Sequence, residues 1–241
     1  YSPSVAGILD GRVDLILVGD SLGSTLYGMK NTQTVTMDMM KNHGLAVNKV
    51  IKKSIKILDM PNKSYDNKII AYRNAKILLN YCKPDLLKIE IDKKKLGILK
   101  HLVDKKINII SHIGVTPQSY KNFNKIKILG KNIKEKNNLL ELARESEKLG
   151  AKAILLECIT KDVAKLITEN TSIPTIGIGA SKYCDGQVLV FDDLINLSLN
   201  IKKPKFVKNY LNFNKLAANA VKKYNREVKL KKFPSIKFTY N

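Results

Sequence analysis

Ionisable side chains stand at or near the ends of successive apolar runs in this sequence. Asp20, Asp59 and Glu90 end or follow the first three such runs. His112 lies near the end of the fourth run, and Glu157 near the end of the fifth. Unpaired burial of each charge would cost on the order of several kcal/mol, so a purely structural role for all of them is disfavoured. The pattern indicates a catalytic or ligand-binding site.

Glu157 is the leading candidate for a general base. It lies in the otherwise apolar stretch Leu155–Ile159. An apolar environment favours the protonated form of a carboxylate, which gives such a group the proton affinity that a base needs near neutral pH. Lys88 and Glu90 are two residues apart on one run, so both should point to the same side of a strand.

Each of these residues also has a structural interpretation. Asp20 could cap a helix and Asp59 could form a turn before Pro61. Lys88 and Glu90 could form a structural ion pair, and His112 could be a satisfied core histidine. These alternatives stay open for each residue alone, and only the joint pattern favours a functional site.

The apolar runs alternate with amphipathic stretches. Each run is nearly continuous in hydrophobicity, as expected for a parallel strand covered on both faces. The runs are Asp14–Val18, Ile55–Met60, Leu86–Ile91, Ile107–Ile113, Ala153–Ile159, Pro174–Ile178 and Gln187–Phe191. The helical stretches are Ser4–Leu9, Thr36–Lys52, Asn67–Tyr81, Lys93–Lys105, Lys134–Leu149 and Lys161–Glu169, with Gly150 placed to end one of them. Such alternation predicts right-handed βαβ units and a parallel sheet.

This order predicts an α/β fold, a (β/α)₈ TIM barrel, in which side chains at the carboxyl ends of the strands meet in one site. Only seven strands are expected, so the first strand of the barrel should precede Tyr1. We expect residues 1–241 to form a single barrel domain. Residues 202–233 read as a basic helical extension packed on that barrel.

The composition excludes several classes of protein. The chain has 241 residues, and no stretch approaches the roughly 20 apolar residues of a membrane span. Three cysteines without a C-x-x-C pair, and an N-terminus without a secretory pattern, predict a cytoplasmic protein. The net charge is +22, but 39 of the 43 basic residues are Lys. Dispersed lysines beside abundant Asn and Ile are typical of compositional drift rather than of a nucleic-acid site.

Eight ordered motifs resemble those of the ketopantoate (3-methyl-2-oxobutanoate) hydroxymethyltransferase family. The motifs are Val18–Gly23, Leu58–Pro61, Lys88–Glu90, Ser111–Ser119, Leu155–Cys158, Ile173–Ala180, Asp185–Val190 and Pro204–Lys208. The resemblance runs from Tyr1 to Pro234. Residues 91–93 and 122–131 depart from the family pattern, in loops near the folate or the rim of the site.

The resemblance implies a (β/α)₈ enzyme of pantothenate biosynthesis. Such an enzyme transfers a hydroxymethyl group from 5,10-methylenetetrahydrofolate to 3-methyl-2-oxobutanoate and gives 2-dehydropantoate. It also implies Mg²⁺ as cofactor and a homo-oligomer, a decamer in this family. No specific nucleic acid and no membrane are expected as partners.

The resemblance further implies roles for single residues. Glu157 would be the catalytic proton acceptor. The carboxylates associated with Mg²⁺ would be Asp20, Asp59 and Glu90. The residues binding the oxoacid would be Asp20, Ser21, Asp59, Lys88 and His112. A 2-oxoacid can chelate Mg²⁺ through its keto and carboxylate oxygens, which suits a site with few carboxylates.

Two other functions compete with this one. The first is a basic nucleic-acid-binding protein built on an enzyme-like scaffold. The second is a decayed, inactive homologue. Retention of all five residues Asp20, Asp59, Lys88, Glu90 and Glu157 argues against decay, because relaxed selection would spare no particular residue.

The charge interpretation can be tested by DNA binding. If the lysine excess is drift, affinity for duplex DNA at physiological salt should be weak and independent of sequence, with a dissociation constant of roughly 10⁻⁴ to 10⁻⁶ M. Fluorescence anisotropy with several unrelated duplexes measures it. Tight, sequence-selective binding at that salt would favour the nucleic-acid-binding alternative.

Overall fold

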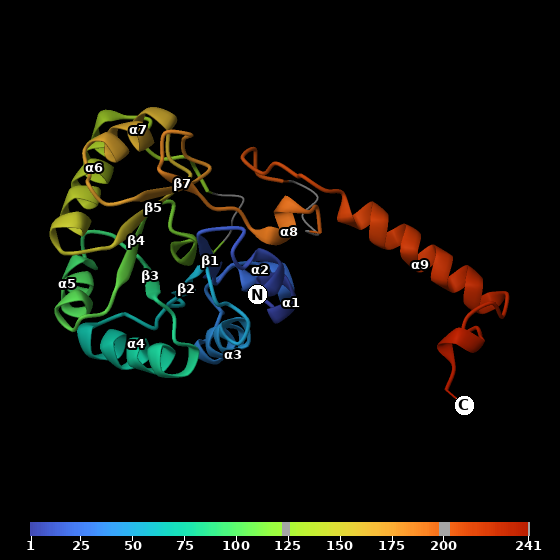
Figure 1. The fold of residues 1–241 in the computed structure, drawn as a ribbon. Helices are drawn as coiled ribbons and strands as arrows, with labels where there is room; N and C mark the ends of the chain where they lie inside the picture. Colours follow the sequence, from blue (N-terminus) through green and yellow to red (C-terminus); the bar gives the residue numbers. More distant parts are fainter. Residues whose placement is uncertain (122–125, 198–202, 241) are drawn as a thin grey trace. The chain divides into compact units, whose positions relative to one another are not determined.

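The protein is built around one parallel β-sheet. The structure is a computed structural model and describes residues 1–121, 126–197 and 203–240. In that part of the chain seven strands pair side by side in sequence order, and the sheet is curled (Figure 1). The strands are β1 (Leu15–Val18), β2 (Ile55–Asp59), β3 (Leu86–Glu90), β4 (Ile109–Gly114), β5 (Ala153–Glu157), β6 (Thr175–Ile178) and β7 (Gly186–Gln187).

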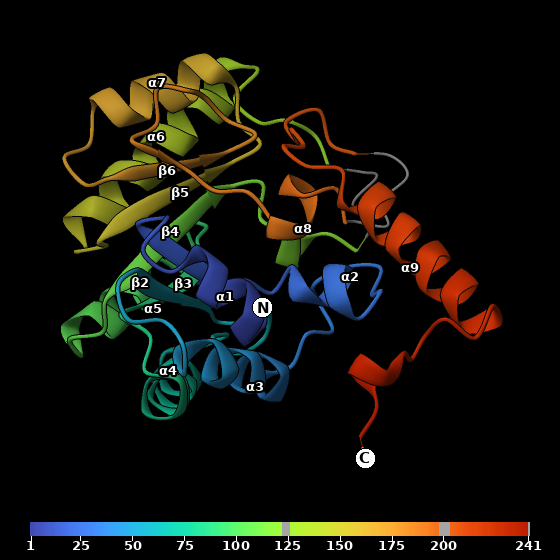
Figure 2. The same ribbon diagram turned by 45° about the vertical axis from the view of Figure 1, so that its right-hand side comes forward.

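Helices cover the outer side of the curled sheet. In Figure 2, α6 and α7 lie above the strands and α3 and α4 lie below them. The helices of this part are α1 (Pro3–Leu9), α2 (Leu22–Leu26), α3 (Met37–Asn48), α4 (Lys68–Cys82), α5 (Leu96–Asp104), the 3₁₀ turn η1 (Pro117–Ser119), α6 (Ile133–Lys148) and α7 (Lys161–Glu169). Thr36, Asn67 and Asn132 cap three of these helices, because each side chain accepts a backbone N–H of the first turn.

Alternation along the strands creates two apolar layers. On β3, Leu87 and Ile89 face the helices and belong to the large outer core, whereas Leu86 belongs to a smaller inner layer. The inner layer also contains Ile57 and Leu155. It encloses a cavity of about 50 Å³ that Lys88 borders. Since side chains alternate, the inner face of each strand can be apolar at one end and polar at the other.

The sequence predicted the first six strands and the helices between them to within a few residues. The seventh strand is an exception, because only Gly186 and Gln187 pair with β6 and Phe191 begins a helix. Gly150 follows α6 with φ of +93°, as predicted for a glycine that ends a helix. A closed eight-stranded barrel is not what the described residues form. Their sheet has seven strands, with β1 and β7 at its edges.

The chain divides into two compact units, Tyr1–Val188 and Leu189–Asn241. The second unit contains α8 (Phe191–Leu194), α9 (Phe213–Lys229) and the 3₁₀ turn η3 (Ile236–Phe238). The helix expected within residues 202–233 is therefore present as α9, and its packing on the barrel stays a prediction. Among the described residues, no helix has the length and apolar character needed to cross a membrane.

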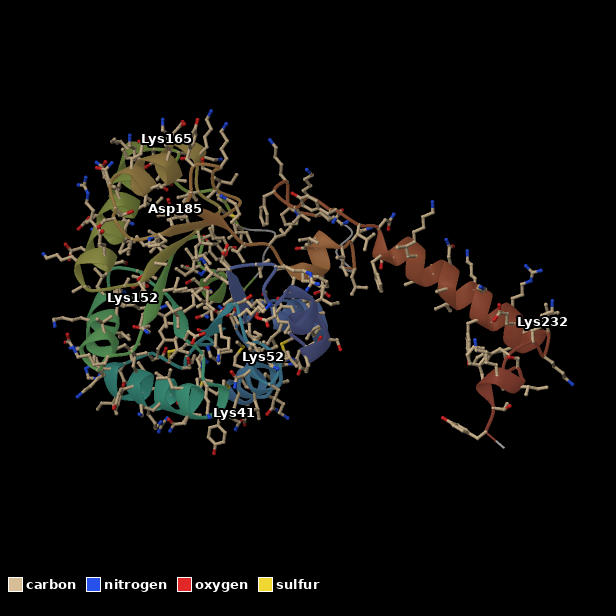
Figure 3. All side chains as sticks on the ribbon, in the orientation of Figure 1. Lys41, Lys52, Lys152, Lys165, Asp185 and Lys232 are labelled. Atoms are coloured by element: carbon tan, nitrogen blue, oxygen red, sulfur yellow. The ribbon has the colours of Figure 1, made fainter. Side chains whose placement is uncertain are left out.

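Lysines are dispersed over the surface of the first unit. Figure 3 labels Lys41 on α3 and Lys165 on α7, both at the outer surface of the helices. Among the described lysines only Lys88 is buried. This distribution agrees with the interpretation of the lysine excess as compositional drift.

Gly114 ends β4 at a point where a side chain has no room. Its φ is +101°, and a Cβ built on it would lie 2.3 Å from the carbonyl oxygen of Glu157 on β5. A non-glycine residue would therefore be strained and would force β4 and β5 apart.

Gly114→Ala should lower the free energy of unfolding by about 2 kcal/mol or more. Gly7 is a matched control, because it lies in α1 with nothing within 4 Å of its Cβ position. Gly7→Ala should raise the free energy of unfolding by about 0.5 to 1 kcal/mol. Urea denaturation of both variants measures these changes. Equal effects of the two substitutions would contradict the steric argument.

Candidate active site

The polar residues singled out in the sequence meet at the carboxyl ends of β1 to β5. Asp20 follows β1, Asp59 ends β2, Lys88 and Glu90 lie on β3, and His112 lies on β4; all five side chains are buried. Glu157 ends β5 and is partly exposed. Parallel strands bring these ends together because neighbouring residues are in register, Asp59 beside Lys88 and Glu90 beside His112.

Asp20, Asp59 and Lys88 form the buried centre of this group. The backbone N–H of Asp20 donates to Asp59 Oδ2 at 3.0 Å. Lys88 Nζ lies 2.9 Å from Asp59 Oδ1, and both side chains are almost fully buried. A carboxylate oxygen has two lone pairs, so Oδ1 can accept a further ligand beside the ammonium.

Ser21 lies beside Asp20 at the start of α2. Its Oγ is 2.6 Å from the hydroxyl of Tyr1. From Tyr1 the main chain runs through α1 to the opposite end of the sheet. There the Asp10 carboxylate accepts the backbone N–H groups of Lys52, Lys53 and Ser54. These contacts hold α1 along the sheet and place Tyr1 at the site.

His112 connects Lys88 to Glu157. Lys88 Nζ is 3.2 Å from His112 Nδ1, and His112 Nε2 is 3.3 Å from Glu157 Oε2. A protonated lysine can only donate, so Nδ1 accepts and the imidazole proton lies on Nε2, facing the carboxylate. Burial and the charge of Lys88 lower the pKa of His112, against the opposing effect of Glu157. The neutral imidazole therefore orients Glu157.

Glu90 is held by residues outside the predicted set. Both of its carboxylate oxygens lie 3.2 Å from the backbone N of Gln118, which donates to them. The Glu90 backbone N–H donates to the hydroxyl of Tyr65 at 3.2 Å. Glu90 Oε1 is also 3.9 Å from His112 Nδ1. Glu90 thus lies beside the Asp59–Lys88 pair with its own hydrogen-bond partners.

Carboxylates outnumber cations in this buried group. Burial and the nearby charge of Asp59 raise the pKa of Asp20 to about 7. Burial and the charge of Asp20 raise the pKa of Glu90 well above its usual value. Burial alone would lower the pKa of Lys88, but the charges of Asp59, Asp20 and Glu90 more than offset it, and the pKa is raised. With three carboxylates against one ammonium, the site favours a further cation.

A magnesium ion fits this donor set through two carboxylates. No group of three or more His, Cys, Asp or Glu side chains in the described part of the chain is arranged to hold a metal ion. Mg²⁺ is commonly bound through one or two carboxylates while keeping waters and substrate oxygens. The buried Asp59 carboxylate and the Asp20 carboxylate, which interact electrostatically, meet that requirement.

Sequence reasoning did not single out Gln118 or Tyr65. Both are buried, and the Tyr65 hydroxyl donates to Gln118 Oε1. Gln118 lies within the Ser111–Ser119 motif and follows the polar end of β4, and these are the sequence signals that could have drawn attention to it. Of the two divergent loops, residues 91–93 precede α5, where the Asp92 carboxylate accepts the backbone N–H groups of Lys94 and Lys95. In the other loop, residues 122–125 lie outside the described residues.

Comparison with known proteins identifies similar sequences and folds. Residues 1–236 match the model of a family described as ketopantoate hydroxymethyltransferase. The 3-methyl-2-oxobutanoate hydroxymethyltransferase of Pelagibacter ubique is 45% identical over 240 residues, covering 100% of this chain and 91% of the relative. The enzyme of the same name from Syntrophomonas wolfei is 39% identical over 237 residues, covering 98% of this chain and 86% of the relative.

Two solved structures share the fold at low sequence identity. Phosphonopyruvate hydrolase in complex with oxalate and Mg²⁺ has a TM-score of 0.58 and 14% identity, covering 99% of this chain and 86% of that one. Oxaloacetate acetylhydrolase has a TM-score of 0.56 and 12% identity, covering 73% of this chain and 63% of that one. At this identity the likeness concerns the fold alone.

The raised pKa of Asp20 predicts a pH-dependent stability in chelator-treated protein. The folded state holds this proton up to about pH 7, whereas the usual pKa is 3.8, so its contribution to stability is present below about pH 4 and lost as the pH rises through 7. Asp20→Asn should make the free energy of unfolding fall less steeply over that range. Asp104→Asn, on the surface of α5, should leave the slope unchanged. Urea denaturation at several pH values measures both, and an unchanged slope in Asp20→Asn would contradict the assignment.

Proposed function

The chain belongs to the ketopantoate hydroxymethyltransferase family, and we propose that it transfers a hydroxymethyl group from 5,10-methylenetetrahydrofolate to 3-methyl-2-oxobutanoate. The product is 2-dehydropantoate, a precursor in pantothenate biosynthesis. One observation carries the proposal beyond family membership: a buried, carboxylate-rich centre at Asp20 and Asp59 lies next to Glu157, which His112 orients. A site of this kind can bind a chelating oxoacid and remove a proton from it.

In this proposal Mg²⁺ is held by Asp20 and Asp59, with Glu90 beside them. When bound, it would draw electron density from the keto group of the oxoacid and so make the neighbouring C–H bond more acidic. The burial of Asp20 and Asp59 and the excess of buried carboxylates support this placement.

Glu157 is the proposed proton acceptor at C3 of the oxoacid. Its side chain is 18% exposed, in contrast to the buried His112, so substrate can reach it. His112 Nε2 lies 3.3 Å from Oε2, and Oε1 is the oxygen proposed to accept the proton. The resulting carbanion equivalent then forms a C–C bond to the methylene carbon presented by the folate. Both C–N bonds of that carbon are broken, water supplies the hydroxyl oxygen, and tetrahydrofolate leaves.

Lys88 and Ser21 are proposed to bind the oxoacid. Lys88 is the one buried lysine among the described residues, and its ammonium can offset negative charge that develops on the oxoacid. Ser21 offers a hydroxyl at the rim, and the hydroxyl of Tyr1, 2.6 Å away, orients it. His112 contacts both Lys88 and Glu157, so it lies between the lysine proposed to bind the oxoacid and the proposed base.

The enzyme is proposed to be a closed (β/α)₈ barrel that works as a homo-oligomer, a decamer by family resemblance, in the cytoplasm. The two edge strands β1 and β7 support closure by a further strand, because an open edge leaves backbone groups unpaired. The three cysteines, Cys82, Cys158 and Cys184, are free, which agrees with a reducing compartment.

The most direct test is exchange of the C3 proton of 3-methyl-2-oxobutanoate in deuterated water. Exchange should require Mg²⁺ and should not require folate, because it isolates the first proton transfer. Formation of 2-dehydropantoate should then require the folate as well. Absence of exchange in the metal-loaded wild-type protein would contradict the proposed function.

Glu157→Gln tests the identity of the base. Gln keeps the size of the side chain but cannot accept the proton, so the exchange rate should fall by about 10² to 10⁴ while oxoacid affinity is retained. Glu169→Gln, at the exposed end of α7, is the matched control and should exchange normally. Unchanged exchange in Glu157→Gln would move the base role to another group, with His112 next. Loss of binding as well as exchange would mean that Glu157 organises the site.

A further inference from the structure

Gln118 lies at the meeting point of the buried carboxylates, and neither the sequence motifs nor the proposed reaction gives it a role. It is in η1, after β4, and is only 5% exposed. Its amide Nε2 donates to Asp20 Oδ2 at 2.8 Å and to the carbonyl oxygen of Met60 at 3.1 Å. Its backbone N–H donates to the Glu90 carboxylate at 3.2 Å. One residue therefore touches two of the three buried carboxylates.

The hydrogen bonds around Gln118 form a chain in which each donor and acceptor is determined. The Glu90 backbone N–H donates to the Tyr65 hydroxyl, so that hydroxyl donates its own proton to Gln118 Oε1. The two Nε2 protons are then used by Asp20 and by the Met60 carbonyl. Reversing the amide would place its oxygen against the Met60 carbonyl and the Asp20 carboxylate, two oxygen acceptors, and both hydrogen bonds would be lost. The orientation of the amide is thereby fixed.

This arrangement leaves Gln118 no donor with which to bind substrate. Both amide protons and the backbone N–H are engaged, and the backbone carbonyl accepts from Gln33 Nε2 at 2.9 Å. A direct catalytic contact through a Gln118 donor is therefore excluded by the geometry. From its position after β4, the residue instead holds Asp20, which follows β1, and Glu90, which ends β3.

We propose that Gln118 is a positioning residue that sets the orientation and spacing of the Asp20 and Glu90 carboxylates for the divalent cation, with Tyr65 locking its amide. The inference rests on the proposed function, because the cation is part of it. Carboxylates this deeply buried repel one another, so without directed donors the Asp20 side chain would turn away from Glu90. Partners that orient metal ligands typically change metal affinity by about 10- to 100-fold when they are removed.

The test is titration with Mn²⁺ alone, followed by electron paramagnetic resonance, in the absence of substrate. Gln118→Met keeps the length of the side chain and removes all three hydrogen bonds of the amide, so the dissociation constant for Mn²⁺ should rise about 10-fold or more. Tyr65→Phe removes only the hydroxyl and should raise it by a smaller factor. Gln33→Met is the matched control, because it removes a hydrogen bond to the Gln118 carbonyl only, and should stay within about twofold of wild type.

C3 proton exchange provides the second measurement. In Gln118→Met, raising the Mg²⁺ concentration should recover most of the lost exchange rate, since the base Glu157 is untouched. A residue that only fills space would lower the melting temperature of the variant without changing Mn²⁺ affinity, and that result would overturn the proposal. If Gln118→Met does not fold, wild-type Mn²⁺ affinity in Tyr65→Phe would overturn it instead.

The outcomes separate this proposal from the proposed function. Wild-type protein that binds Mn²⁺ and exchanges the C3 proton, beside a Gln118→Met variant with unchanged affinity, would reject the positioning role and leave the function standing. Wild-type protein that neither binds Mn²⁺ nor exchanges the proton would reject both.

Discussion

The ion pair between Lys88 and Asp59 is the interaction on which the site depends. Its two charged atoms are 2.9 Å apart, and both side chains are almost fully buried. Removing either partner would leave a buried charge without compensation, which is strongly destabilising. Lys88 is also the only ammonium among three buried carboxylates, and its contact with Nδ1 determines which nitrogen of His112 carries the proton. The pair thus links the cation-binding side of the site to the base.

The parallel sheet allows charged side chains to be concentrated at one end of otherwise apolar strands. On β3, the inner face changes from Leu86 to Lys88 and Glu90 within five residues, while Leu87 and Ile89 pack on the helices. The apolar half of each strand stabilises the fold. The polar side chains at the carboxyl ends of the strands contact one another rather than apolar residues. Gly114 adds a local requirement, because its backbone approaches Glu157 so closely that no side chain fits between β4 and β5.

The structure also shows where the large positive charge is located. Outside the site, the described lysines are partly or fully exposed, on helices and in loops, and some have acidic partners one helical turn away, as with Lys100 and Asp104. Such exposed pairs contribute little to stability. The net charge of +22 therefore describes the surface. The site has the opposite sign, and it is this local excess of carboxylates that matters for binding a metal ion.

The sequence by itself determined the strands, most helices and the candidate residues of the site. Continuous apolar runs and helical periodicity are local signals, and polar residues such as Asp59 and Glu157 at the ends of those runs can be read directly. The order of motifs also determined the family. These features depend on neighbours in the chain, which is why they need no tertiary information.

Only the tertiary structure decided how those residues are paired. Gln118 touches Asp20 across 98 positions of sequence, and no periodicity records such a contact. The residues next to Glu157 in the sequence are apolar, as expected. Its side chain nevertheless faces His112, which lies on the neighbouring strand β4. The seventh strand shortened to two residues because pairing with β6 ends at Gln187. Contacts between distant segments depend on strand register and loop path, which the chain acquires only when it folds.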